Sequence, residues 1–165
     1  LYGKRPNGER NEAMITENEA YSRLSAKCAM GEQCVHDVCK KMQRWELSDD
    51  AQQRVVKRLI DERFIDEKRY ARAFVRDKSR YNHWGATKIK YELMKKGIGA
   101  NDIEDALTEI DEEESLSALR HLIESKRRSV KGKSEYEIKA KLVRFAVSRG
   151  FSVQDVLRVV NLDED

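Results

Sequence analysis

The chain has 165 residues, of which 39% are hydrophobic and 38% are charged, with a single proline and a formal net charge of +3. No stretch approaches the roughly 18 consecutive apolar residues of a membrane span, and no secretory signal is visible, so we expect a cytoplasmic protein without membrane contact. The three cysteines are an odd number, which argues against the paired disulfide framework of a small secreted domain.

Helices dominate the expected secondary structure, because Leu, Ala, Glu, Lys and Arg are abundant and no segment alternates apolar and polar residues. Residues 1–15, which include Pro6 and two glycines, predict a flexible leader. A capping box of Thr16 and Glu19 then opens the first helix, which continues through Leu24. Further helices are expected over residues 32–44, 49–62, 66–80, 86–96, 101–110, 112–128, 134–149 and 152–161.

A helix-ending pattern occurs twice in the second half of the chain. Lys96-Gly97-Ile98 and Arg149-Gly150-Phe151 each follow an amphipathic run and precede a spaced apolar set. Because glycine can end a helix in the left-handed conformation, we expect positive φ angles at Gly97 and Gly150.

A weaker copy of the pattern, without the glycine, lies around Ser48. Ser48 corresponds to Gly99 and Ser152, and these positions are 51 and 53 residues apart. This interval leaves room for about three helices of ordinary length in each unit. The sequence therefore predicts an all-α protein built from three-helix repeats.

Catalytic and metal-binding chemistry is not expected. The three histidines stand alone, and no pattern of Ser, Cys and His would assemble a nucleophile with a base and an orienting acid. The intervals between Cys28, Cys34, His36 and Cys39 fit a zinc site poorly, so we interpret the cysteines as small apolar core residues. We expect no enzymatic activity, no cofactor and no metal.

Positive charge is concentrated in two parts of the sequence. In the helix from Asp66, Lys68, Arg72, Arg76 and Arg80 recur every four residues and form one cationic face. The segment 126–149 has nine Lys and Arg residues against two Glu residues, a net charge of +7. Such faces attract DNA phosphates or an acidic protein surface; the alternative is a solvated face with local ion pairs. The candidate binding residues are Lys68, Arg72, Arg76, Lys88, Lys95, Lys96, Arg127, Arg128, Lys131, Lys133, Lys141 and Arg144.

The aromatic residues predict core packing rather than a platform for stacked bases, because they lie in apolar helical registers or directly after a helix stop. These residues are Tyr70, Phe74, Tyr91, Tyr136, Phe145 and Phe151. Trp45 and Trp84 each lie beside a turn, where two roles stay open, local packing and contact with a partner.

Three stretches together resemble one protein family. They are LIDERFIDEKRYARAFVRDKSR (59–80), GATKIKYELMKKGI (85–98) and RFAVSRGFSVQDV (144–156). The first is the most specific, because its FIDE, RYA and FV elements match a family block in order and spacing. Over roughly residues 17–161, the chain resembles the RecX family of RecA regulators. It departs from the family at Trp45-Glu46-Leu47, where relatives often have a Lys-Gly-apolar helix stop.

The resemblance implies three tandem three-helix repeats in an elongated, curved stack that lies in the groove of a RecA filament on single-stranded DNA. It also implies a non-enzymatic inhibitor of RecA ATP hydrolysis, of strand exchange and of stimulated repressor cleavage. We expect a monomer whose partner is the RecA filament, with single- or double-stranded DNA as a further partner of the basic faces.

The expected organisation follows from these patterns. Residues 16–80 form a first repeat with its connecting helix, residues 81–128 a second repeat, and residues 129–165 a third repeat with a C-terminal tail. The alternative function is a helical nucleic-acid-binding module without a recombinase partner, and a weaker alternative is a peptide-binding helical scaffold.

Overall fold

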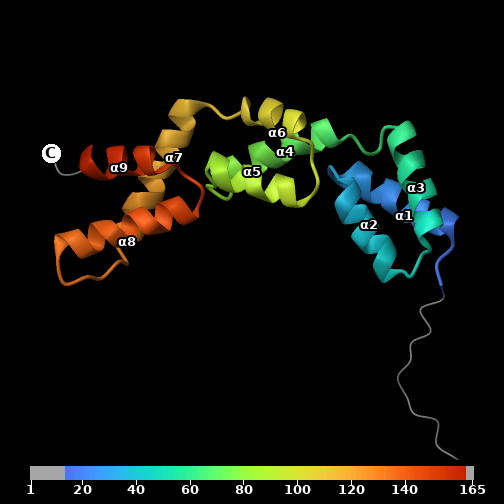
Figure 1. Cartoon of the computed structure of the whole chain (residues 1–165), viewed down its shortest axis with the longest axis horizontal. Coiled ribbons are helices and arrows are strands. Elements are labelled where there is room, and N and C mark those ends of the chain that lie inside the picture. Colours follow the sequence, from blue (N-terminus) through green and yellow to red (C-terminus); the bar gives the residue numbers. More distant parts are fainter. Residues whose placement is uncertain (1–13, 163–165) are drawn as a thin grey trace, which may run out of the picture. The chain divides into compact units, whose positions relative to one another are not determined.

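The computed structural model describes residues 14–162, so residues 1–13 of the expected leader lie outside the described range. Within that range the chain is all-α, with nine helices and no strand (Figure 1). The expected all-α fold of three-helix repeats is confirmed. The helices are α1 (Glu17–Met30), α2 (Val35–Arg44), α3 (Asp49–Asp61), α4 (Glu67–Arg80), α5 (Ala86–Lys95), α6 (Ala100–Leu107), α7 (Glu112–Arg127), α8 (Glu135–Ser148) and α9 (Val153–Leu162).

The chain divides into two compact units, residues 1–65 with α1–α3 and residues 66–165 with α4–α9. In the second unit α4 packs against both α5 and α6, and it buries Tyr70, Ala71 and Val75. The sequence predicted this helix as the connecting helix of a first repeat over residues 16–80. By packing, α4–α6 form one three-helix group and α7–α9 form another.

The first unit has a core of aliphatic side chains from all three helices. Cys34 is fully buried, while Cys28 and Cys39 are half-buried and pack against this core, as expected for small apolar residues. Trp45 also packs against the core, and the guanidinium of Arg23 lies 5.7 Å from its ring centroid. The buried residues of this core are Leu24, Val38, Met42, Val55, Leu59 and Ile65.

The helix stops of the second unit have the expected backbone conformation. Gly97 has φ 70° and Gly150 has φ 96°, which confirms the prediction of positive φ at both glycines. After each glycine, the next residue donates its N–H to a carbonyl five residues earlier, from Ile98 to Leu93 at 3.2 Å and from Phe151 to Ala146 at 3.4 Å. This is the Schellman arrangement, which satisfies carbonyls at a helix end.

The first repeat forms the same stop without a glycine. Glu46 occupies the left-handed position with φ 58°, and Leu47 donates its N–H to the Met42 carbonyl at 3.1 Å. The buried side chain of Gln52 donates to the Leu47 carbonyl at 2.9 Å and so holds the turn from the following helix. The departure from the family pattern at residues 45–47 therefore leaves the turn geometry intact.

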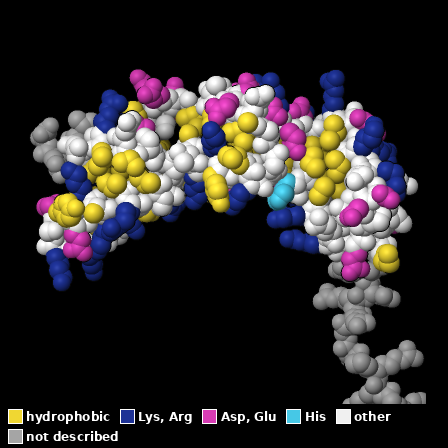
Figure 2. All heavy atoms as spheres, in the orientation of Figure 1, with side chains coloured by type: hydrophobic (Ala, Val, Ile, Leu, Met, Phe, Trp, Pro, Cys, Tyr) yellow, Lys and Arg dark blue, Asp and Glu magenta, His cyan; other side chains and the backbone are white. Residues whose placement is uncertain are grey.

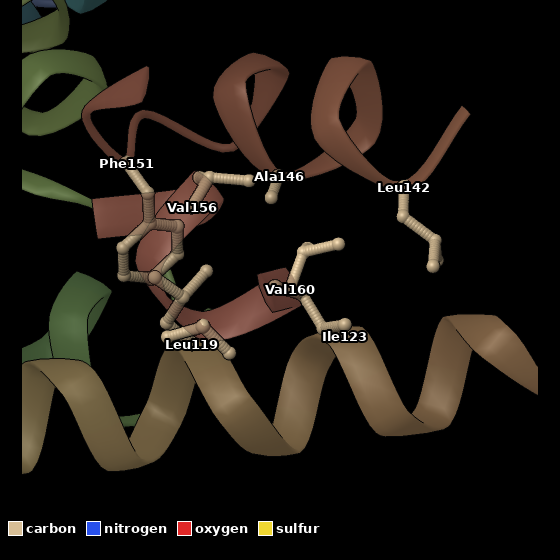
Figure 3. Packing of buried hydrophobic residues seen from close by; sticks show 8 residues of the cluster. Leu119, Ile123, Leu142, Ala146, Phe151, Val156 and Val160 are labelled. Atoms are coloured by element: carbon tan, nitrogen blue, oxygen red, sulfur yellow. The ribbon is translucent and has the colours of Figure 1, made fainter. Parts of the chain in front are cut away.

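The third repeat closes around side chains that meet from three directions (Figure 3). Leu119 and Ile123 project from α7, Leu142 and Ala146 from α8, and Val156 and Val160 from α9. Phe151, which directly follows the glycine stop, fills the end of this core. The apolar residue after the stop is thus a structural anchor between α8 and α9.

Backbone hydrogen bonds join the second and third repeats. Gly85 donates its N–H to the Arg149 carbonyl at 2.8 Å, and Thr87 donates to the Gly150 carbonyl at 3.1 Å. The first N–H groups of a helix have no partner within the helix, so the α8–α9 turn caps α5. A Cβ on Gly85 would lie 2.3 Å from the Gly150 carbonyl carbon, so both positions require glycine for this close approach.

We expect Gly85→Ala to destabilise the chain by about 1–3 kcal/mol, because the added methyl would overlap backbone that cannot move aside. Gly99→Ala is the matched control, since Gly99 is also an N-cap but a Cβ there meets nothing within 4 Å. Urea unfolding of both variants measures the difference. Equal losses at the two positions would mean that the cap, and not the joint between repeats, requires glycine.

Candidate functional site

Two of the four basic residues on the cationic face of α4, Lys68 and Arg72, lie near one carboxylate. Arg72 donates to Asp105 through Nη2 at 2.8 Å and through Nε at 3.2 Å, and Lys68 Nζ lies 3.7 Å from the same carboxylate. The hydrogen bond from Arg72, followed by the charges of Arg72 and Lys68, lowers the pKa of Asp105. Arg76 is exposed on the same helix and forms no ion pair with a described carboxylate.

Other basic residues of the second unit are also paired with carboxylates. Lys90 lies 3.0 Å from Glu104 and Lys95 lies 3.1 Å from Glu92. Lys141 lies 3.5 Å from Glu137. The pKa of Glu137 is lowered, first by the hydrogen bond that the Lys133 backbone N–H donates and then by the charge of Lys141.

A second group of cations lies on aromatic rings instead. Lys78 Nζ is 4.9 Å and Lys88 Nζ is 4.5 Å from the centroid of the Trp84 ring. Lys126 and Arg149 lie 4.8 Å and 5.0 Å from the centroid of the Phe145 ring. These four side chains form no ion pair with the carboxylates of residues 14–162. We call Lys78, Lys88, Lys126 and Arg149 the cation row.

The joint between the repeats brings the two halves of the cation row together. Trp84 directly precedes Gly85, whose N–H donates to the carbonyl of Arg149, and Lys88 packs against Gly150. The N–H of Trp84 donates to the Lys78 carbonyl at 3.1 Å, which fixes the turn to the end of α4. Figure 2 shows Lys and Arg side chains along the lower edge of the second unit, where Figure 1 places α5 and α8.

The aromatic rings of this row are half-buried and hold cations on their faces, so they offer no free platform for bases. Core packing was expected for six aromatic residues, and Tyr70 and Phe151 are indeed buried. The prediction was wrong for Tyr91 and Tyr136, which are 59% and 83% exposed. The buried residues of their helices are Ile89 and Leu93 in α5 and Leu142 and Ala146 in α8, so the apolar character of the tyrosines did not place them in the core.

Of the twelve candidate binding residues, the structure brings only Lys88 into the cation row. Sequence reasoning missed Lys78, Lys126 and Arg149 as members of the row. Phe145 and Arg149 are four residues apart, a spacing that brings side chains together on a helix. This spacing could have predicted the cation–ring contact of Arg149. The remaining candidates that lie exposed outside the described ion pairs are Arg76, Arg128, Lys131, Lys133 and Arg144. Lys96 and Arg127 are half-buried, and Lys96 Nζ lies 6.0 Å from the Tyr70 ring centroid.

A pocket of about 390 Å³ also lies in the second unit, and both arginines and acids line it. His83 and His121 meet there with ring centroids 6.5 Å apart. No cluster of three metal-ligating side chains occurs among the described residues. Throughout residues 14–162, each helix is too short or too polar to cross a bilayer.

Comparison with known proteins finds two consecutive family models on the second unit. Residues 66–107 match the second three-helix domain of RecX, and residues 112–160 match the third. The chain is 33% identical over 114 residues to the regulatory protein RecX of Clostridium botulinum, an alignment that covers 68% of this chain and 53% of that protein. It is 34% identical over 105 residues to the regulatory protein RecX of Bacillus cytotoxicus, covering 64% and 38%.

Solved structures agree with these matches. A crystal structure of regulatory protein RecX superposes with a TM-score of 0.79 at 25% identity, over 88% of this chain and 73% of that chain. The crystal structure of RecX from Lactobacillus salivarius has a TM-score of 0.71 at 24% identity, over 88% and 94%, and supports the fold. The chain spans about half the length of the curated relatives that it matches. By its two domain models and these relatives, the chain belongs to the RecX family of regulatory proteins.

Proposed function

We propose that the chain is a non-enzymatic, cytoplasmic and monomeric regulator that binds the RecA filament on single-stranded DNA. In this proposal it inhibits ATP hydrolysis by RecA, strand exchange and the stimulation of repressor cleavage. Family membership supports the partner. The single observation that supports the working surface is the cation row, four basic side chains across two repeats that pair with no carboxylate of residues 14–162.

The cation row suits a polyanionic target for two physical reasons. Charges that are already paired, such as Arg72 with Asp105, would have to lose one partner to gain another, whereas the row carries no such cost. The aromatic rings also restrict the lysine side chains before binding, which lowers the entropy lost on association. Phosphates of the filament DNA or an acidic surface of RecA would meet this row.

RecA would be inhibited if the chain contacts two neighbouring RecA subunits simultaneously. ATP turnover and strand exchange require subunits to rearrange, and a ligand that binds one arrangement better stabilises it. The second and third repeats are joined through backbone, so contacts made by one repeat resist movement at the other. Arg76, Arg128, Lys131, Lys133 and Arg144 extend the proposed surface beyond the row.

We expect the double substitution Lys88→Gln with Lys126→Gln to weaken filament binding about tenfold, because two screened charge contacts together contribute on the order of 1–2 kcal/mol. Inhibition of DNA-stimulated ATP hydrolysis by RecA should weaken in parallel, with thermal melting nearly unchanged. Titration of fluorescent filaments and an ATPase assay measure the two effects.

The charge-matched control is Lys68→Gln with Lys90→Gln, which removes two lysines that lie near Asp105 and Glu104. Binding should fall by no more than about threefold in this control. Equal losses in the two double variants would show that net charge alone matters. A parent chain that binds single-stranded DNA but never inhibits RecA would instead support the nucleic-acid-binding alternative.

The role of the α4 face can be tested by gain of charge. Asp105→Asn releases Lys68 and Arg72, so we expect about threefold tighter filament binding at low salt and no gain at high salt, where screening removes it. Glu113→Gln, at the exposed start of α7, makes the same charge change as a control. Unchanged affinity for Asp105→Asn would remove Lys68 and Arg72 from the binding surface.

A further inference from the structure

Two histidines from different repeats meet in the second unit. His83 lies in the turn between α4 and α5 of the second repeat, and His121 lies on α7 of the third. Their ring centroids are 6.5 Å apart, and both residues line the pocket of about 390 Å³. The two are 38 residues apart in the sequence, so the local spacings on which the expectation of no metal rested could not reveal the pair.

His83 has two features that its place in a turn does not explain. Its backbone has φ 53°, the left-handed conformation that glycine adopts at lower cost. Its Nδ1 atom is buried and has no hydrogen-bond partner among residues 14–162. Because nearly all buried polar atoms in folded proteins have a partner, an atom in this condition points to a water molecule or an ion at the site.

The charges around the histidines favour a cation over an anion. Two guanidinium groups and three carboxylates line the pocket, so its formal charge with neutral histidines is −1. The Asp111 carboxylate accepts the N–H of Glu114 at 2.9 Å and so caps α7, whereas the Glu114 side chain is exposed at the pocket. The charged lining residues are Arg76, Arg80, Glu109, Asp111 and Glu114.

The distance between the two rings suits a shared metal ion after a small movement. An imidazole nitrogen binds zinc at about 2.0–2.1 Å, which places the ring centroid about 3.2 Å from the ion. Two rings on one ion therefore have centroids about 5 Å apart at a tetrahedral angle and about 6.4 Å apart on opposite sides. His121 is exposed on its helix, so rotation of its side chain can supply the difference of roughly 1 Å.

We propose that His83 and His121 bind one divalent transition-metal ion of the kind that prefers imidazole, such as Zn²⁺, Ni²⁺ or Cu²⁺. Each histidine supplies one ring nitrogen. No group of three ligating side chains occurs in the part of the chain that the structure describes, so water completes the coordination. Glu114 lies two turns before His121 on the same face of α7, where its carboxylate accepts a hydrogen bond from that water.

The ion would connect the second and third repeats beside their joint. His83 precedes Gly85 by two residues, and Gly85 and Thr87 donate the two backbone hydrogen bonds of the joint. A metal that binds only the folded chain stabilises it by mass action. The site therefore makes the stability of the second unit depend on the metal concentration. This inference does not depend on the proposed function.

The test is a titration of the full chain with Ni²⁺, without a histidine tag and with the cysteines kept reduced. At ten times the dissociation constant, Ni²⁺ should raise the melting temperature by about 3 °C or more. Calorimetry should show one bound ion for each chain. Cu²⁺ should quench the fluorescence of Trp84, which directly follows His83 and lines the same pocket.

The third histidine of the chain provides a matched control. His83→Asn and His121→Gln should each weaken metal binding about tenfold or more, because each removes one of two protein ligands. Asparagine tolerates the left-handed conformation at position 83, and position 121 is an exposed helix surface, so the fold survives both changes. His36→Gln, in the first unit, should leave the affinity unchanged.

Hydrogen exchange tests whether the ion connects the repeats. Bound Ni²⁺ should slow the exchange of the Gly85 and Thr87 N–H groups at least threefold in the parent, and it should not slow them in His121→Gln. Unchanged exchange in the parent would overturn the proposed connection of the repeats.

The remaining outcomes decide the site itself. Binding that both His83→Asn and His121→Gln abolish, and that His36→Gln leaves intact, would confirm the assignment. A parent that binds no ion, or binds it as well after His121→Gln, would overturn it. A Co²⁺ complex with an intense thiolate absorption band would assign the metal to the cysteines of the first unit and would also overturn it. None of these results changes the expectations for RecA, so failure here leaves the proposed function standing.

Discussion

Two hydrogen bonds between backbones, Gly85 to Arg149 and Thr87 to Gly150, determine how the second unit is built. They are possible because two glycines allow the start of α5 to approach the α8–α9 turn to a distance that no Cβ would permit. The turn carbonyls accept hydrogen bonds from the first N–H groups of α5, which have no partner within the helix. The same contact therefore caps α5 and attaches the second repeat to the third. This contact joins the two repeats through their backbones.

The same contact explains the location of the cation row. Trp84 lies beside Gly85, and Phe145 lies one turn before Arg149, so the joint brings two half-buried rings from different repeats into one region. Each ring holds two cations on its faces. Positive charge accumulates where these cations lie on aromatic rings instead of pairing with a carboxylate of residues 14–162, and this gives the surface its proposed affinity for polyanions.

The sequence predicted the repeat, its interval and the helix stops, because a helix that ends at a left-handed glycine has a local sequence pattern. This pattern does not depend on tertiary contacts. It did not reveal that Glu46 adopts the same conformation, since the support from Gln52 comes from a different helix. The candidate site was predicted by counting charges along the chain. Counting cannot distinguish Arg72, which a carboxylate 33 residues away neutralises, from Lys88, which lies on a ring. Pairing is a tertiary property, so the cation row emerged only in the folded chain.

The joint of Gly85 and Gly150 also sets how the second unit responds to force. A force that pulls the second and third repeats apart would act on these two adjacent hydrogen bonds. The short covalent connection between α6 and α7 lies elsewhere and would stay intact. The buried cluster of the third repeat consists only of residues between Leu119 and Val160, so this core would stay closed when the two bonds break. The third repeat would then separate as a folded body on the short α6–α7 connection and could re-form the joint without refolding. If the protein binds subunits that move relative to one another, such a joint would limit the force that one repeat transmits to the other, and the limit would be reversible.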